Sequence, residues 1–235
     1  MRALSNADCL HLWERGAGLH PLDQSLAALA MAYPEESCES LADWPLGRRN
    51  RAVAELHCAC FGRNLDGQVS CPQCAGNLEF HVDARALVKT ETEDHPIPEI
   101  SLEGRSFRIP ATRDLARAVR QSNLRMAAVA LVESCRTDGA GPADWRDEDL
   151  EEIGDRMAAA DPLAEIRLTF MCAQCNHQWQ EDLDLGAFLW LEIESRSKRL
   201  LSEVHTLAAA YGWSEHEILS FSEPQRRVYL EMVRA

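Results

Sequence analysis

The first quarter of the chain shows apolar residues at the spacing of short helices. One predicted helix closes at Gly16, and the next spans PLDQSLAALAMAYP, which is bounded by prolines as a helix of about three turns should be. After a predicted turn at 44–47, a third helix places Val53 and Leu56 on one face. The pattern therefore predicts an N-terminal helical segment.

The C-terminal part has the clearest helical pattern. A long amphipathic helix is indicated by Leu189, Ile193, Leu200, Val204, Leu207 and Tyr211. Gly212 is well placed to end this helix in a left-handed cap. Ser214 with Glu217 forms the capping box of a further short helix. Ser222 with Gln225 forms another, so the chain is expected to end in helices joined by sharp turns.

The middle of the chain mixes strands with helices. Apolar residues alternate with polar ones over 77–83, and a second strand is predicted over 164–170. A glycine turn divides 100–110 into a hairpin. The polar, proline-containing stretch 90–99 is predicted to be a loop, and the acidic stretch 147–160 a helix.

Two matched cysteine pairs carry the strongest chemical signal. Cys71 and Cys74 lie in SCPQCAGNLEF, and Cys172 and Cys175 repeat their spacing in MCAQCNHQW. Structural zinc takes four ligands in a tetrahedron, and each pair is joined to a predicted strand. The entropic cost of closing a loop grows only logarithmically with its length. The long separation between the two pairs is therefore no strong objection to one shared site. We therefore predict one four-cysteine Zn²⁺ site of the zinc-ribbon type.

Other ligand sets and another chemistry remain open. Cys58 and Cys60 in HCACFG could replace one pair, and His57 or His177 could replace one thiolate. Two thiols at C-x-C spacing on a helix point to different sides, so Cys58 and Cys60 are interpreted as buried small residues. Each CxxC could also be a redox dithiol, but such motifs usually open a helix, whereas glycine and a strand follow the first pair. Four thiolates leave no open position for substrate, which favours a structural metal over a catalytic one.

These elements predict an α+β fold in which helices dominate. A small zinc-ribbon-like β unit would be formed by 63–90 together with 163–186. It would link an N-terminal helical segment, 1–62, to a C-terminal helical hairpin within 187–235. The residues between its two halves, 91–162, would form an insertion containing a hairpin and helices.

Composition narrows the functional classes. The formal net charge is −14, from 38 acidic and 24 basic side chains, and such a surface repels phosphate backbones. One local basic run, GRRNR at 47–51, could contact an anionic partner but is interpreted as a solvated helix start. No uncharged apolar run reaches membrane-spanning length, and the N-terminus lacks signal-peptide features. Nine cysteines in such a chain indicate reduced thiols or metal ligands, so we expect a cytoplasmic protein.

No recognised catalytic motif occurs in the sequence. There is no phosphate-cradling glycine loop, no HExxH and no nucleophile elbow. We therefore expect a protein that is not an enzyme.

Several stretches together resemble a known family. They are DWPLGRRNRAVAEL, CFGRNL, CPQCAGNLEFHVD, CAQCNHQWQEDLDLGAFLWLEIE and LLSEVHTLAAAYGWSEHEILSFSEPQRRVYLEMV. In this order they are similar to the baseplate hub and baseplate assembly proteins of contractile-tailed phages, and to their relatives in phage-tail-like contractile injection systems. The last stretch is the most characteristic, and HCAC departs from the family pattern.

The resemblance implies a structural or chaperone-like assembly protein whose partners are baseplate, hub or spike proteins. It also implies that the four cysteines hold the fold, that the C-terminal helices are a docking surface, and that the protein acts in the cytoplasm or within an assembled particle. The rival interpretations are a zinc-ribbon protein associated with nucleic acid or transcription, and a redox or metal-relay protein.

Overall fold

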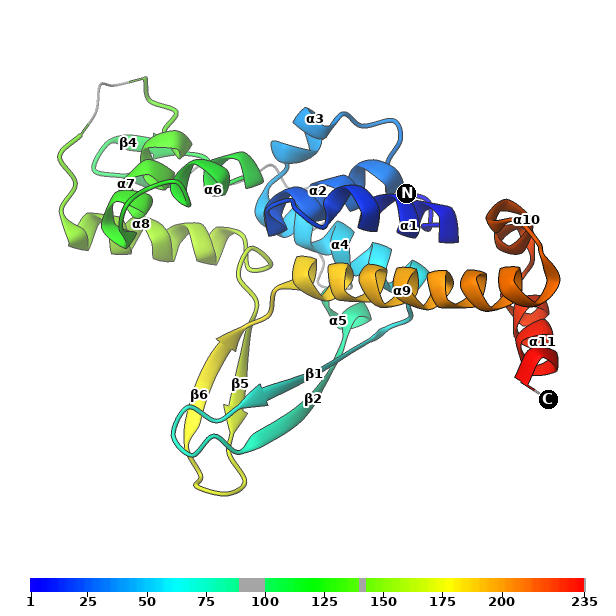
Figure 1. The fold of residues 1–235 in the computed structure, drawn as a ribbon. Coiled ribbons are helices and arrows are strands. Elements are labelled where there is room, and N and C mark those ends of the chain that lie inside the picture. Colours follow the sequence, from blue (N-terminus) through cyan, green and yellow to red (C-terminus); the bar gives the residue numbers. More distant parts are fainter. Residues whose placement is uncertain (89–99, 140–142, 235) are drawn as a thin grey trace.

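The computed structural model describes residues 1–88, 100–139 and 143–234. Within these ranges, helices dominate and the strands form three small antiparallel sheets, which confirms the predicted helix-dominant α+β class. Figure 1 shows an elongated row of helices from which two β-hairpins project together as an arm. The predicted loop at 90–99 lies outside the described residues.

The main core forms where the N-terminal helices pack against the first half of a long C-terminal helix, α9 (Leu185–Tyr211). Gly16 lies against the ring of Trp190 of α9, so this helix crossing has no room for a side chain at position 16. The N-terminal helices are α1 (Asn6–Gly16), α2 (Pro21–Ala32), α3 (Cys38–Ala42) and α4 (Leu46–Cys60). Fully buried side chains in this core include Leu29, Leu41, Leu56, Leu189 and Ile193.

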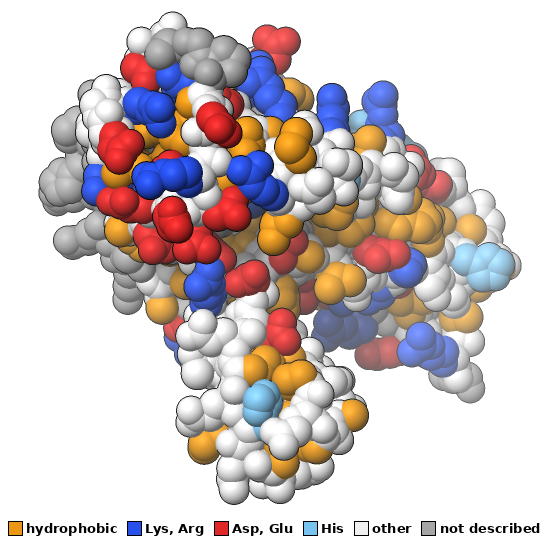
Figure 2. Space-filling model, turned by 90° about the vertical axis from the view of Figure 1, so that its left-hand side faces the viewer, with side chains coloured by type: hydrophobic (Ala, Val, Ile, Leu, Met, Phe, Trp, Pro, Cys, Tyr) orange, Lys and Arg blue, Asp and Glu red, His pale blue; other side chains and the backbone are white. Residues whose placement is uncertain are grey.

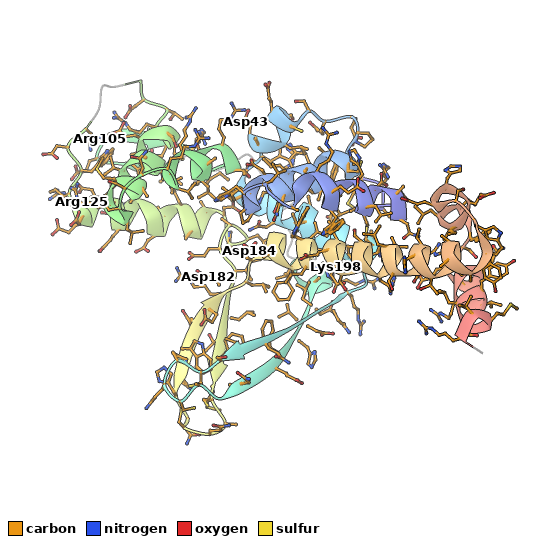
Figure 3. The ribbon with its side chains drawn as sticks, viewed as in Figure 1. Asp43, Arg105, Arg125, Asp182, Asp184 and Lys198 are labelled. Carbon is orange, nitrogen blue, oxygen red and sulfur yellow. The ribbon has the colours of Figure 1, made fainter. Side chains whose placement is uncertain are left out.

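Local signals explain where these helices begin. The Ser5 hydroxyl and the Asp8 carboxylate form a reciprocal capping box at the start of α1. At the junction between the arm and α9, the Asp184 side chain accepts a hydrogen bond from the backbone N–H of Ala187 (Figure 3). None of the described helices combines the length and the apolar character that crossing a bilayer requires.

The arm consists of two separate hairpins. Strand β1 (Asn64–Ser70) pairs with β2 (Asn77–Asp83), after which the short helix α5 (Ala84–Val88) returns to the body. Strand β5 (Arg167–Met171) pairs with β6 (Gln178–Asp182), which leads directly into α9. The alternation at 77–83 therefore predicts β2 correctly, whereas its partner strand was not predicted.

The residues between the two hairpins build a second core. They form β3 (Ile100–Leu102), β4 (Arg105–Phe107), α6 (Thr112–Ala118), α7 (Leu124–Cys135) and α8 (Asp147–Ala160). The predicted hairpin is confirmed, and its turn consists of two residues with positive φ at positions 103 and 104. Side chains buried in this core include Phe107, Trp145 and Ile153.

The chain ends in a small helical module at the far end of α9 (Figure 1). Gly212 ends α9 with a φ of +70°, as the sequence predicts. Helix α10 (Glu215–Ser220) begins with the predicted capping box, and α11 (Glu223–Arg234) follows it. Their small core consists of Leu207, Ile218 and Leu230.

The basic run at 47–51 does start a helix, as predicted, but the prediction that this start is solvated is wrong for most of the run, although Arg48 is exposed. Arg49 is only 8% exposed and Asn50 7%. The backbone N–H of Gly47 donates a 2.8 Å hydrogen bond to the Asp161 carboxylate, because the chain following α8 passes against the start of α4. This end of α4 is therefore a buried joint.

Candidate metal centre

The turn between β1 and β2 forms a tight knuckle around the first cysteine pair. The backbone N–H of Cys71 donates to the carbonyl oxygen of Gly76 at 2.9 Å, and that of Ala75 donates to the carbonyl oxygen of Cys71 at 2.8 Å. Ala75 has a φ of +57°, in the left-handed region that L-residues seldom adopt. These bonds aim Cys71 and Cys74 toward one point.

The turn between β5 and β6 repeats this geometry. The backbone N–H of Cys172 donates to the carbonyl oxygen of His177, and that of Asn176 donates to the carbonyl oxygen of Cys172, both at 2.9 Å. Asn176 has a φ of +58°, at the position that corresponds to Ala75. Two segments about a hundred residues apart thus adopt the same metal-knuckle conformation.

The structure brings the four predicted cysteines together at the tip of the arm. The four sulfur atoms all lie within 4.8 Å of one another. Across the two hairpins, the Sγ atoms of Cys71 and Cys175 are 3.7 Å apart, and those of Cys74 and Cys172 are 3.5 Å apart. A tetrahedron with metal–sulfur bonds of about 2.3 Å has edges of about 3.8 Å. The spacing fits a four-thiolate metal site and is far too long for a disulfide bond of about 2.05 Å.

The electrostatics of the cluster favour a bound cation. Backbone N–H groups of Cys175 and Gln174 lower the pKa of the Cys172 thiol to about 6. The N–H of His177 lowers the pKa of the Cys175 thiol, but burial and the neighbouring sulfurs outweigh it and raise that pKa to about 12. One thiolate therefore forms readily, whereas four adjacent thiolates require a positive charge between them.

The predicted alternative ligands in α4 lie outside this cluster. The Cys60 thiol accepts a hydrogen bond from the backbone N–H of Leu4 at 3.2 Å, and Cys58 is half-buried against the main core. The ring Nδ1 of the buried His57 donates to the carbonyl oxygen of Gly62 at 3.0 Å. Cys58, Cys60 and His57 therefore contribute to packing and hydrogen bonding in the helical body.

A row of aromatic rings connects the arm to the body. Phe188 of α9 lies 6.2 Å from Phe80 of β2, which lies 5.3 Å from Phe170 of β5. Trp179 of β6 continues the row, 5.6 Å from Phe170 and stacked on His177 at 5.9 Å. His177 therefore packs beside the cysteine cluster and is not part of it. This row was not predicted from the sequence, although the alternation of apolar residues in both hairpins was a signal for it.

Burial differs between the four cysteines. Cys71 and Cys172, the first residue of each pair, are 2% and 0% exposed. Cys175 is half-buried and Cys74 is exposed. A metal ion would therefore be shielded on one side by the hairpins and be open to other molecules near Cys74.

Comparisons of the chain with protein-family models, with curated proteins and with solved structures found no match.

Proposed function

We propose that this chain is a non-enzymatic assembly protein of a contractile injection system or phage-tail baseplate, and that one structural Zn²⁺ ion on Cys71, Cys74, Cys172 and Cys175 joins the two hairpins of its arm. The observation that supports the metal is that four thiols converge at tetrahedral spacing. The assembly role rests on the sequence resemblance described above.

Zinc is supported by the chemistry of the donor set. Four soft sulfur ligands are typical of structural zinc, and a filled tetrahedron has no free position for water or substrate. The ion would connect two hairpins that are otherwise separate sheets. Its role is therefore to fix the arm, and no reaction step is assigned to it.

A protein-binding role is supported by the charges around the cluster. The two knuckles and their flanking residues, 67–78 and 169–180, contain no Asp, Glu, Lys or Arg. Figure 2 shows the same contrast, because acidic and basic side chains crowd the insertion while the arm below shows mostly uncharged surface. A nucleic-acid-binding zinc ribbon needs basic side chains to neutralise phosphates. An uncharged tip is better suited to contact with protein.

The metal is tested by measuring zinc in the purified protein by mass spectrometry. We expect one zinc per chain, and loss of that zinc in both Cys71→Ser and Cys172→Ser. Cys38→Ser is the matched control, because this exposed cysteine begins α3 and lies outside the cluster. If only one of the two knuckle variants lost zinc, a shared site would be wrong.

The assembly role is tested by deleting the gene in the strain that encodes the protein. We expect electron micrographs to show sheath and tube components that lack complete baseplates. The wild-type gene should restore complete particles, whereas the Cys172→Ser gene should not. Normal particles in the deletion strain would refute the assembly role and leave the zinc measurement unaffected.

A further inference from the structure

Helix α11 has an apolar surface wider than the part that it buries. Arg226 and Leu230 face the small C-terminal core and are 2% and 9% exposed. Outside this buried side, Val228 is 49% exposed, Met232 60% and Val233 38%. Val228 and Met232 stand at the i, i+4 spacing of one helical face, and Tyr229 and Val233 stand at the same spacing between that face and the buried side. Exposed apolar residues gathered in this way mark an interaction surface.

The position of α11 is fixed, so rotation of the helix cannot bury this face. Arg226 Nε donates to the Glu203 carboxylate of α9 at 2.9 Å, and Arg226 Nη1 donates to the carbonyl oxygen of Phe221 at 2.6 Å. Leu230 packs beside these bonds against Leu207. Breaking this buried pair would leave a buried charge without a partner, which is strongly unfavourable.

Aromatic rings extend the same surface. Tyr229 of α11 lies 4.9 Å from Trp213 and 5.7 Å from Phe221. Tyr211 stacks on Trp213 at 4.4 Å and is 39% exposed. Tyrosine and tryptophan are enriched among the residues that dominate binding energy at protein interfaces.

The charges on α11 indicate the occupant of this surface. Arg227 and Glu231 border the exposed apolar face on the same side; Arg227 also lies 3.6 Å from Glu223 one turn earlier, and its side chain is 69% exposed. Two copies of the helix packed antiparallel through their exposed faces, around a two-fold axis at the height of residue 230 along the helix, would place Val228 of each copy opposite Met232 of the other. The same arrangement brings Arg227 of each copy to within about two residues, or about 3 Å along the axis, of Glu231 of the other.

We propose that the exposed face of α11, with Tyr211 and Trp213 beside it, binds the same face of a second copy of this chain. The contact is isologous, because each apolar and each charged residue meets its counterpart through the two-fold axis. The opposite signs of Arg227 and Glu231 make the border of the surface complementary to itself. This inference goes beyond the proposed assembly function and does not depend on zinc.

Light scattering coupled to size-exclusion chromatography tests the contact on the purified full-length protein. The wild type should have twice the chain mass of 26.3 kDa, and Met232→Asp should have the single-chain mass. Leu124→Asp is the matched control, because Leu124 is an exposed leucine at the start of α7 and should leave the dimer unchanged. Circular dichroism should show the wild-type helix content in both variants. A wild-type protein with single-chain mass at every concentration, or a dimer that persists in Met232→Asp, would overturn the proposal.

A charge exchange tests the antiparallel arrangement. Arg227→Glu and Glu231→Arg should each weaken the dimer severalfold at low salt, because each puts like charges opposite one another. The double variant should recover most of the lost affinity, because it restores opposite charges across the two-fold axis. A double variant as weak as the two single variants would refute the antiparallel arrangement.

Discussion

Asp161 acts as a distant cap for helix α4. The residue before that helix is Pro45, whose side chain makes no capping hydrogen bond. The Asp161 carboxylate accepts the backbone N–H of Gly47 instead, at 2.8 Å. Nearby, the Asn50 side chain donates to the carbonyl oxygen of Leu163 at 2.7 Å. The sequence gives no sign of this joint, because its partners are more than a hundred residues apart.

Replacing Asp161 should show how much this joint stabilises the fold. Asp161→Ala is expected to lower the free energy of unfolding by about 1–2 kcal/mol, the usual cost of a lost helix cap. Asp161→Asn should cost less, since its amide oxygen can accept the same bond and burial already raises the pKa of the Asp161 carboxyl. Urea denaturation measures both variants, with the exposed Asp155→Ala of α8 as control. Equal losses in the Asn and Ala variants would contradict the capping role.

Asp114 is a buried charge with a complete set of partners. It is 0% exposed and accepts hydrogen bonds from Arg108 at 2.6 and 2.9 Å and from the backbone N–H of Ala111 at 2.9 Å. Burial by itself raises the pKa of Asp114, but the bonds from Arg108 and Ala111 outweigh it and hold the pKa below the usual value. Asp114 therefore links the residue that follows β4 to α6 as a carboxylate.

This pKa shift has a definite consequence for stability. Asp114→Asn should lower the free energy of unfolding by about 2–3 kcal/mol at pH 7, less than for a fully buried pair because Arg108 is partly exposed. A lowered native pKa contributes stability above the unfolded value of 3.8, and this contribution is lost as the pH falls toward the native pKa. The difference between wild type and variant should therefore shrink below about pH 4.

Denaturation titrations at several pH values measure this difference. The exposed pair Glu152–Arg156 supplies the control, since Glu152→Gln should cost under about 1 kcal/mol. A wild-type advantage over Asp114→Asn that did not change with pH would show that the carboxylate charge is not the stabilising feature.

At the scale of elements, the two knuckles differ at one strained position. Ala75 and Asn176 have almost the same positive φ, +57° and +58°. Asparagine tolerates this conformation, whereas for alanine it costs about 1 kcal/mol or more. The first knuckle therefore contains backbone strain that the second does not.

Glycine substitutions should separate the two knuckles. Ala75→Gly is expected to raise the free energy of unfolding of the metal-loaded protein by up to about 1 kcal/mol, partly offset by the greater freedom of the unfolded chain. Asn176→Gly should be nearly neutral. Ala173→Gly is the control and should destabilise, because position 173 does not have a positive φ. Thermal unfolding measures the stability of the three variants. If Ala75→Gly were less stable than Ala173→Gly, the interpretation that Ala75 is strained would be contradicted.

The elements that could be predicted are those with strong local signals. Gly212 and the capping box at Ser214 fix the ends of helices α9 and α10 in sequence and structure alike. Strand β1 was missed because Gly67 interrupts its alternation of apolar and polar residues. That glycine has a tertiary reason, since the rings of Phe80 and Phe188 occupy the space of a side chain there.

At the scale of the whole molecule, repetition of a short motif was more informative than local pattern. The spacing of Cys71 and Cys74 recurs at Cys172 and Cys175, and this recurrence identified the four residues that the structure brings together. The buried joint at Gly47 had no such repeat. When two residues far apart in the chain belong to no repeated motif, a contact between them can be recognised only when the fold is known.

Metal removal should loosen the arm and spare the body. At the tip of the arm the two hairpins meet at the four cysteines, whereas α1, α2, α4 and α9 share an apolar core of their own. A chelator should therefore increase amide hydrogen exchange in 64–83 and 167–182 by more than about a hundredfold, since structural zinc contributes about 10 kcal/mol or more to folding of its site. Exchange in α4 and in the first half of α9 should change little.

Hydrogen-exchange mass spectrometry with and without chelator measures the exchange of the arm and of the body. Cys172→Ser should show the increased exchange of the arm even without chelator. If α4 and α9 lost protection together with the arm, the ion would support the whole fold. The proposed role of the ion would then have to change, because it would no longer be limited to fixing the arm. If the arm alone responds, the body and the α11 surface remain intact without metal, and defects in assembly caused by cysteine variants can be assigned to the arm.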